Sequence, residues 1–259
     1  MSTVIYSSPI FGPVNSRRLG VSLGINLLPG DGKVCSFDCI YCECGLNAER
    51  HPRQPLPTRE EVASALEARL RQMKAEGPHP DVLTFAGNGE PTLHPHFPEI
   101  IDDTIRLRDT YFPDAHISVL SNATQCMRSR VHDALMRVNN NILKLDTVDV
   151  EFINRVDRPN SHYDVRAIID GLKAFNGHLI VQTIFLSGND AEGRDVDNTG
   201  EHFVRPWLAA LSEIAPQSVM IYTIDRETPI RSLRKATPET LDAIAAQVRA
   251  LGLPCSVAY

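Results

Sequence analysis

The strongest constraint on the fold of this chain is the alternation of short β-branched runs with longer helical patterns. Alternation of this kind is the signature of repeated βα units whose strands form a parallel sheet. The pattern predicts six strands, at 20–28, 82–86, 117–120, 142–145, 179–186 and 218–224. We therefore expect an α/β fold, an open partial (β/α)6 TIM-type barrel, with the active site at the carboxyl ends of its strands.

Two of the helices between these strands have clear terminal signals. Thr58 and Glu61 have the spacing of a capping box at the start of a helix with one apolar face. A second helix begins with Thr237 as its N-cap, and its predicted buried face includes Leu251. Because the chain has no second composition regime and no internal repeat, we expect one domain over residues 1–259.

Composition narrows the class of protein. Hydrophobic residues make up 42% of the chain and charged residues 22%, which excludes a disordered, collagen-like or coiled-coil chain. No apolar run approaches the roughly 18 residues of a membrane span, and the first residues lack a signal-peptide pattern. We therefore expect a cytoplasmic protein without a membrane partner. The formal net charge of -6 disfavours nucleic-acid binding over the whole surface.

Four of the six cysteines fall within ten residues, which suggests a metal site. Cys35, Cys39 and Cys42 form a C-x3-C-x2-C triad directly after the first predicted strand. Three thiolates leave one iron of a 4Fe–4S cluster without a protein ligand, so that a substrate or cofactor can chelate it. The alternative is a structural zinc site that also uses Cys44, although zinc ligands usually come as two separated pairs. Cys44 could otherwise be a resolving thiol or a hydrogen-atom donor, but we expect it to be a bystander.

The triad, with Tyr41 before its last cysteine, resembles the hallmark of the radical S-adenosylmethionine (SAM) superfamily. Members of that superfamily carry a glycine-rich G-G-E-P-like stretch at the end of the second strand, and a Gly-Asn-Gly-Glu-Pro stretch follows strand 82–86 here. The resemblance implies a 4Fe–4S cluster held by the three cysteines and SAM as cofactor. It further implies that the methionine amino group of SAM meets backbone carbonyls and the Glu90 carboxylate within this stretch. The residues concerned are Gly87, Asn88, Gly89, Glu90 and Pro91. Without the resemblance, the stretch is a strand-to-helix turn.

Other candidates for cofactor contact follow or lie within the later strands: Ser121, Asn122, Lys144, Asp146, Gln182 and Thr183. The first two match the superfamily's ribose- and carboxylate-contacting position; the alternative is an Asn turn that caps the next helix. Lys144 and Asp146 flank Leu145, so both face the barrel interior, either as ligand contacts or as a satisfied ion pair.

Three arginines are candidate catalytic residues that grip an anionic group of the substrate: Arg226, Arg17 and Arg18. A guanidinium matches carboxylate and phosphate geometry with two parallel hydrogen bonds, although each arginine could equally form a surface ion pair. The glycine-containing segment 187–200 is a candidate lid, or else a solvated connection. His94 lies in a proline-flanked turn, which favours a structural role over proton transfer.

Segments before the triad and near the end of the chain give a closer resemblance. Residues 11–20, 22–29 and 221–226 look like those of the radical enzymes similar to the tRNA-wyosine synthases, the 4-demethylwyosine synthase-like group. The 4-demethylwyosine synthases carry additional cysteines upstream of the triad, whereas this chain has none before Cys35. Together with the acidic net charge, this difference makes tRNA a disfavoured partner.

The superfamily resemblance implies a mechanism. The reduced cluster donates one electron into SAM, and the resulting 5'-deoxyadenosyl radical removes hydrogen from a small-molecule or nucleobase substrate. Such an enzyme needs an electron donor such as flavodoxin or ferredoxin. One alternative is a glycyl-radical-enzyme activase with a protein substrate, although the Asp-Gly-Pro-Gly-x-Arg-like opening of those activases is missing from this sequence. The other is a non-catalytic iron–sulfur or zinc binding module, which would not need the Gly87 to Pro91 stretch.

Overall fold

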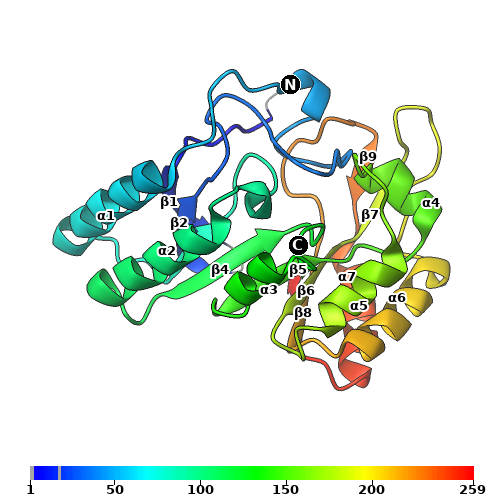
Figure 1. Ribbon diagram of the computed structural model, residues 1–259. Helices are drawn as coiled ribbons and strands as arrows, with labels where there is room; N and C mark the ends of the chain where they lie inside the picture. The colour runs from blue at the N-terminus through cyan, green and yellow to red at the C-terminus, as the bar shows by residue number, and fades with distance from the viewer. Residues whose placement is uncertain (1–2, 17–18) are drawn as a thin grey trace.

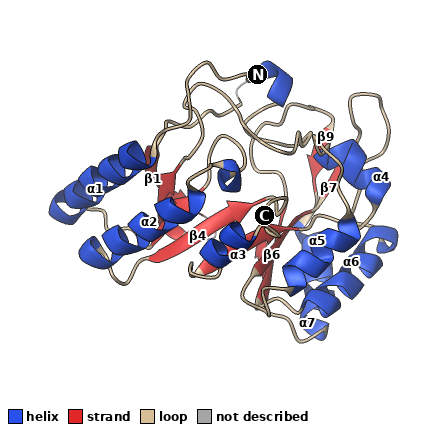
Figure 2. Cartoon of the chain, in the orientation of Figure 1, coloured by secondary structure: helices blue, strands red, loops and turns tan. Residues whose placement is uncertain are grey.

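The computed structural model describes residues 3–16 and 19–259 as a curled sheet with helices on its outer side (Figures 1 and 2). The main sheet has eight strands in the order β1-β2-β3-β4-β5-β6-β8-β10. β1 runs antiparallel to β2, and all other neighbours in this sheet are parallel. The prediction of an open α/β partial barrel is confirmed, and the six predicted strands correspond to β2 to β6 and β8.

The strands are β1 Ile10–Ser16, β2 Gly20–Ile25, β3 Val82–Phe85, β4 His116–Ser121, β5 Asn140–Lys144, β6 Ile180–Ile184, β7 Leu186–Gly188, β8 Ser218–Tyr222, β9 Leu233–Lys235 and β10 Cys255–Ala258. The helices are α1 Arg59–Glu76, α2 Phe97–Tyr111, α3 Ser129–Leu135, α4 Val150–Phe152, α5 Val165–Lys173, α6 Glu201–Ile214 and α7 Pro238–Ala250. A π-helix, Ile153–Asp157, continues α4, and short 3-10 turns lie at Asn47–Glu49 and Pro91–Leu93.

The sequence patterns missed the two edge strands of the main sheet. β1 contains Pro13 and a register shift between Phe11 and Val14, and proline within a run argues against a regular strand. β10 has four residues, of which only Val257 is β-branched. The predicted strand 179–186 is two strands, because the chain leaves the main sheet after Ile184 and β7 pairs with β9 in a second sheet.

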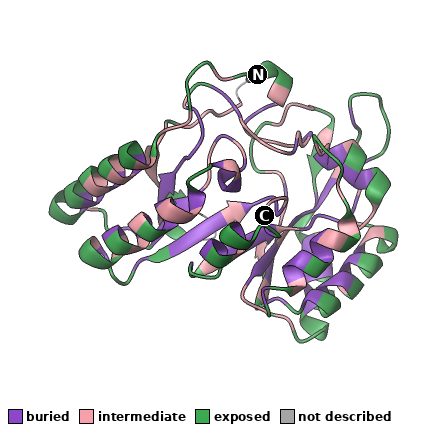
Figure 3. Ribbon diagram, viewed as in Figure 1, coloured by how far each residue is buried: buried purple, intermediate pink, exposed green. Residues whose placement is uncertain are grey.

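The two faces of the main sheet differ in chemistry because side chains alternate along each strand. Outward-facing residues such as Leu83, Phe85 and Val119 are fully buried in one apolar core with the helices, and Figure 3 shows the strands and inner helix faces as buried. Burying each such side chain contributes roughly 1.5–3 kcal/mol. Inward-facing residues are more polar: the Ser22 and Thr84 hydroxyls lie 2.8 Å apart. The helices thus support the sheet from outside and leave polar groups on its hollow side.

The predicted helix signals are confirmed at the N-termini and partly wrong at one C-terminus. The Thr58 side chain accepts a hydrogen bond from the Glu61 amide, and the Glu61 carboxylate accepts one from the Thr58 amide. Thr237 caps α7 as predicted. Leu251 is 43% exposed, however, because α7 ends at Ala250 and the next residue leaves the buried stripe. Among the helices of the described residues, none is long and apolar enough to cross a membrane.

Candidate active site

The three cysteines lie on a loop between β2 and α1, at the carboxyl edge of the main sheet; we call residues 33–45 the cysteine loop. One side of this loop is bonded to the glycine-rich stretch. The Val34 amide donates to the Asn88 carbonyl at 2.9 Å, and the Glu90 amide donates to the Val34 carbonyl at 3.0 Å. The structure therefore brings together two motifs that are more than forty residues apart in the sequence.

The other side of the cysteine loop is bonded to residues 156–160, at the end of the π-helix. The Asp38 amide donates to the Asp157 carbonyl at 3.0 Å, and the Ile40 amide donates to the Val156 carbonyl at 2.9 Å. The Asn160 side chain donates to the Cys35 carbonyl at 2.7 Å. Sequence reasoning missed this segment, because backbone hydrogen bonds have no residue signature. Short π-helices are frequent at functional sites, but their sequence signal is weak.

The three thiols influence one another electrostatically. Burial raises the pKa of Cys35 to about 12 and that of Cys39 well above its usual range, and the charge of Cys42 adds to both shifts. At Cys42 a hydrogen bond from the Cys44 thiol and then the charge of Lys33 lower the pKa to about 6, against the effect of burial. Because metal binding selects the thiolate form, a bound cluster would offset the burial penalty on these sulfurs.

The donor set fits an iron–sulfur cluster. Across residues 3–16 and 19–259, no group of three or more Cys, His, Asp or Glu side chains is arranged to hold one metal ion. A 4Fe–4S cluster does not require such convergence, because each thiolate binds a different iron. The Cys44 thiol, the predicted fourth zinc ligand, is 3.3 Å from the Gly87 carbonyl. Three sulfurs spread along one loop therefore fit a cluster better than they fit a single zinc ion.

Glycine is required in the glycine-rich stretch. Gly87 and Gly89 have φ of +132° and +131°, a region that other residues rarely enter. A Cβ atom on Gly89 would lie 1.9 Å from the Val34 carbonyl oxygen, and one on Gly87 would lie 2.7 Å from the Asn26 side chain. The glycines thus allow this stretch to pack directly against the cysteine loop and the residue that follows β2.

The side chains of Glu90 and Asn88 hold neighbouring segments of the chain. The buried Glu90 carboxylate accepts hydrogen bonds from the Ser121 hydroxyl at 2.8 Å and the Asn122 amide at 2.6 Å. The Asn88 side chain exchanges two 2.8 Å hydrogen bonds with the backbone of Tyr6. The Glu90 carboxylate therefore already accepts hydrogen bonds from within the chain, and its contact with the SAM amino group stays a prediction.

Asn122 joins the end of β4 to the cysteine loop. Its side-chain amide donates to the Ser36 hydroxyl at 2.9 Å and lies 3.6 Å from the Cys35 sulfur. Its side-chain oxygen accepts from the Thr124 amide at 3.1 Å. It does not cap the next helix, because the N-cap of α3 is Arg128. The Asn turn of the alternative interpretation is therefore present, but its helix-capping role is wrong.

Lys144 and the buried Asp146 form an ion pair, which is one of the two interpretations that their alternation allowed. The Lys144 ammonium contacts Asp146 and the Tyr41 hydroxyl and lies 2.8 Å from Asp157. Burial raises the pKa of Asp157 to about 6, although the charge of Lys144 acts against this shift. Leu145 packs into the outer core as predicted. Of these side chains only Tyr41 lines the cavity described in the next paragraph. Lys144 and Asp146 contact its hydroxyl and thereby hold its ring in place.

A cavity of about 490 Å³ opens at the carboxyl edge, within the usual size range of small-molecule sites. It is lined by the cysteine loop, the glycine-rich stretch, the sheet interior, the N-terminal segment and the loop after β8, including Cys42, Cys44, Gly87, Gly89, Thr84, Gln182, Tyr6, Tyr222 and Arg226. The prediction for Thr183 is wrong: it faces outward and accepts a hydrogen bond from the Trp207 ring nitrogen at 3.1 Å. The cavity is therefore the place where the predicted motifs meet.

Arg226 borders the cavity from the loop after β8, which lies beside the cysteine loop in Figure 1. Its guanidinium donates to the Tyr6 hydroxyl at 2.7 Å and pairs with Glu43 at 2.9 Å. Arg17 and Arg18 lie outside the described residues. The segment 187–200, predicted as a lid, does not line the cavity and pairs at its start with β9.

His94 has the structural role that its turn favoured. It is buried, and its Nε2 lies 2.9 Å from the Pro57 carbonyl oxygen. Burial lowers its pKa, which keeps the ring neutral. Its contacts connect the turn before α2 to the start of α1, away from the cavity.

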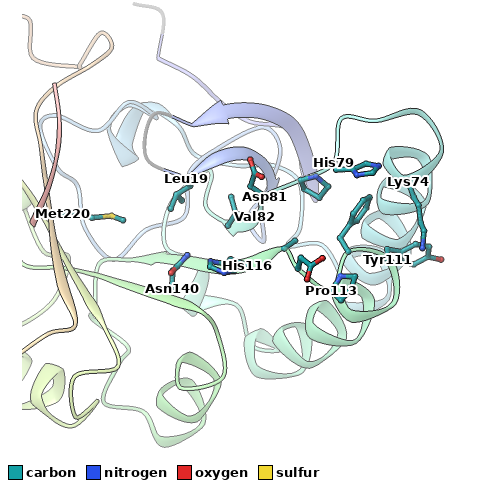
Figure 4. A pocket seen from close by; sticks show the side chains of 14 residues that line it. Leu19, Lys74, His79, Asp81, Val82, Tyr111, Pro113, His116, Asn140 and Met220 are labelled. Atoms are coloured by element: carbon teal, nitrogen blue, oxygen red, sulfur yellow. The ribbon is translucent and has the colours of Figure 1, made fainter. Parts of the chain in front are cut away.

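A larger groove of about 850 Å³ lies at the opposite, amino-terminal edge of the strands (Figure 4). Leu19, Asn140 and Met220 lie at one end of it, and His79 and Tyr111 at the other. None of the predicted cofactor or metal residues lines this groove. In α/β barrels the catalytic groups follow the carboxyl ends of the strands. We therefore assign the chemistry to the carboxyl-edge cavity, although it is smaller than this groove.

Comparison with known proteins agrees with this arrangement. The model of the radical SAM superfamily matches residues 31–197, which include the cysteine loop, the glycine-rich stretch and Asn122. The UPF0026 protein of Helicobacter pylori strain 26695 is 30% identical over 237 residues, covering 90% of this chain and 71% of the relative. The chain belongs to the radical SAM superfamily, in its UPF0026 family.

Solved structures show the same fold. A radical SAM methyltransferase from Sphaerobacter thermophilus has a TM-score of 0.65 at 16% identity, covering 91% of this chain and 65% of that one. SuiB of Streptococcus suis, crystallised with S-adenosylmethionine, has a TM-score of 0.62 at 15% identity, covering 90% and 50%. As a radical SAM enzyme, this protein uses a 4Fe–4S cluster and SAM, and it needs a reductant and a substrate.

Proposed function

We propose that Cys35, Cys39 and Cys42 bind the 4Fe–4S cluster and leave one iron open to SAM in the carboxyl-edge cavity. The observation that carries this proposal is that Cys42 lines the cavity together with Gly87 and Gly89. When bound, the cluster and SAM supply a 5'-deoxyadenosyl radical that removes hydrogen from the substrate. The protein's own contribution is to place the substrate beside the cofactor and to exclude water.

The contacts around the cavity support distinct roles for the other predicted residues. We assign cofactor contact to the backbone of Gly87 to Pro91 and to the side chain of Gln182, because these border the cavity or lie next to it. Ser121 and Asn122 are held by Glu90, and the side-chain amide of Asn122 lies near the Cys35 sulfur. Lys144 and Asp146 act through Tyr41, whose hydroxyl they bond and whose ring forms part of the wall.

The substrate that the cavity favours is a small molecule or a nucleobase with an anionic group. The volume suits a molecule of that size, and Thr84, Gln182 and Tyr222 offer hydrogen bonds. Arg226 can exchange Glu43 for a substrate anion at low cost, because its side chain is 52% exposed and such ion pairs contribute about 0.2–1 kcal/mol. We therefore assign the binding of that anion to Arg226.

Within the superfamily, we place this enzyme near the group similar to the tRNA-wyosine synthases. The support is the sequence of segments 11–20, 22–29 and 221–226. Described residues of all three segments, among them Phe11, Ser22 and Arg226, line the cavity. The net charge of -6 favours a free small molecule or nucleobase over tRNA. The electron donor in this proposal is a flavodoxin or a ferredoxin.

Anaerobic reconstitution tests the proposed function. We expect about four irons per chain, a paramagnetic resonance spectrum of the reduced cluster that changes when SAM is added, and formation of 5'-deoxyadenosine. Cys39→Ala should lose all three properties. Cys255→Ser is the matched control, because Cys255 lies on β10 and does not line the cavity. Zinc without iron, or a cluster indifferent to SAM, would overturn the proposal.

A further inference from the structure

Lys33 is a buried cation at the start of the cysteine loop. Its side chain is only 1% exposed, although lysines are almost never fully buried without a partner. The ammonium donates a 2.8 Å hydrogen bond to the carbonyl of Gly45, at the other end of the loop. The Lys33 side chain therefore connects the two ends of the loop that carries Cys35, Cys39 and Cys42.

The positive charge of Lys33 is only partly compensated. Its acidic neighbour is Asp38, whose carboxylate is 3.5 Å away, 22% exposed and already accepts a 2.7 Å hydrogen bond from the Asn47 amide. Lys144, the cation on the other side of the loop, faces two buried carboxylates. Carboxylates therefore compensate the charge of Lys33 less fully than that of Lys144.

The charge of Lys33 reaches all three cysteines. The Cys42 side chain is a hydrogen-bond partner of Lys33, and the charges of Cys42, Cys35 and Cys39 all act on the ammonium. The cation thus lies within electrostatic range of all three proposed cluster ligands.

We propose that Lys33 is a positioning residue that connects the ends of the cysteine loop and raises the reduction potential of the cluster by its fixed positive charge. This inference rests on the proposed function. Reduction transfers one electron from the external donor to the cluster, and no bond is made or broken. The cluster and its three thiolates together already carry a net negative charge before this electron arrives. A nearby cation therefore stabilises the reduced form more than the oxidised form.

The test is a redox titration of the reconstituted protein, followed by paramagnetic resonance, with charge-matched variants. In Lys33→Met we expect the ratio of reduced to oxidised cluster at a fixed solution potential to fall about tenfold, a shift of about 59 mV to lower potential for one electron. Lys33→Arg should stay near the wild type. Asp38→Asn should shift the potential in the opposite direction, because it removes the compensating carboxylate.

Iron and sulfide contents separate the possible failures. Wild-type protein that binds no cluster overturns the proposed function and the role of Lys33 with it. A full cluster with an unchanged potential in Lys33→Met overturns the inference alone and leaves the proposed function intact. If Lys33→Met fails to retain iron, Lys33→Gln, which keeps a hydrogen-bond donor but removes the charge, decides the question: a lower potential supports the role of Lys33, and an unchanged potential refutes it.

Discussion

Replacing Gly89 by alanine tests how the glycine-rich stretch supports the cysteine loop. Gly89 has φ of +131°, and a Cβ atom there would lie 1.9 Å from the Val34 carbonyl oxygen. This contact is with backbone, so no side-chain rotation relieves it. The two segments must separate, and their separation breaks the Val34 to Asn88 and Glu90 to Val34 hydrogen bonds.

The expected loss follows from these two causes. Backbone strain at such a φ costs about 1–3 kcal/mol. Each of the two hydrogen bonds contributes about 0.5–1.5 kcal/mol, so the total loss in the free energy of unfolding is about 4 kcal/mol. For a chain of this size, 1 kcal/mol corresponds to about 2–4 °C in Tm, so we expect Tm to fall by about 8–16 °C.

Urea and thermal unfolding of the cluster-free protein measure this loss, and iron content after reconstitution measures its effect on the cysteine loop. Gly193→Ala is the matched control: its φ is +80°, but nothing lies within 4 Å of the added Cβ. It should lose only the strain cost of about 1–2 kcal/mol and keep its iron. The reasoning is refuted if Gly89→Ala loses no more stability than Gly193→Ala and binds iron fully.

Three further predictions concern other contacts. Lys144→Met should lower the free energy of unfolding, measured in urea, by about 3–5 kcal/mol, because the carboxylates of Asp146 and Asp157 would remain buried without their cation. A decrease below about 1 kcal/mol would contradict this. The folded-state pKa of Asp157 is raised to about 6, above its value in the unfolded chain. As the pH rises from 4 to 7, the free energy of unfolding of the wild type should therefore fall by up to about 3 kcal/mol relative to that of Asp157→Asn. If the difference in the free energy of unfolding between the two proteins does not change with pH, the pKa of Asp157 is not raised. Thr58→Ala should cost about 1 kcal/mol without changing iron content, because it removes only the cap of α1.

Much of the fold and part of the site could be predicted because their signals are local. The short β-branched runs located six strands, and the Thr58 and Thr237 caps located two helix starts. The strand β1 was missed because Pro13 interrupts its pattern. Leu251 was placed in the buried face because periodicity alone does not show where a helix ends.

The sequence by itself determined the chemistry that the chain can support. Three cysteines at fixed spacing, followed by glycines after the next strand, specify donors and backbone conformations without reference to any distant residue. The tertiary structure alone decided which partners the other side chains meet: Glu90 with Asn122, Arg226 with Glu43, and Lys33 with Gly45. The physical reason is that a carboxylate, guanidinium or ammonium accepts many partners, so only the packing of distant segments selects one.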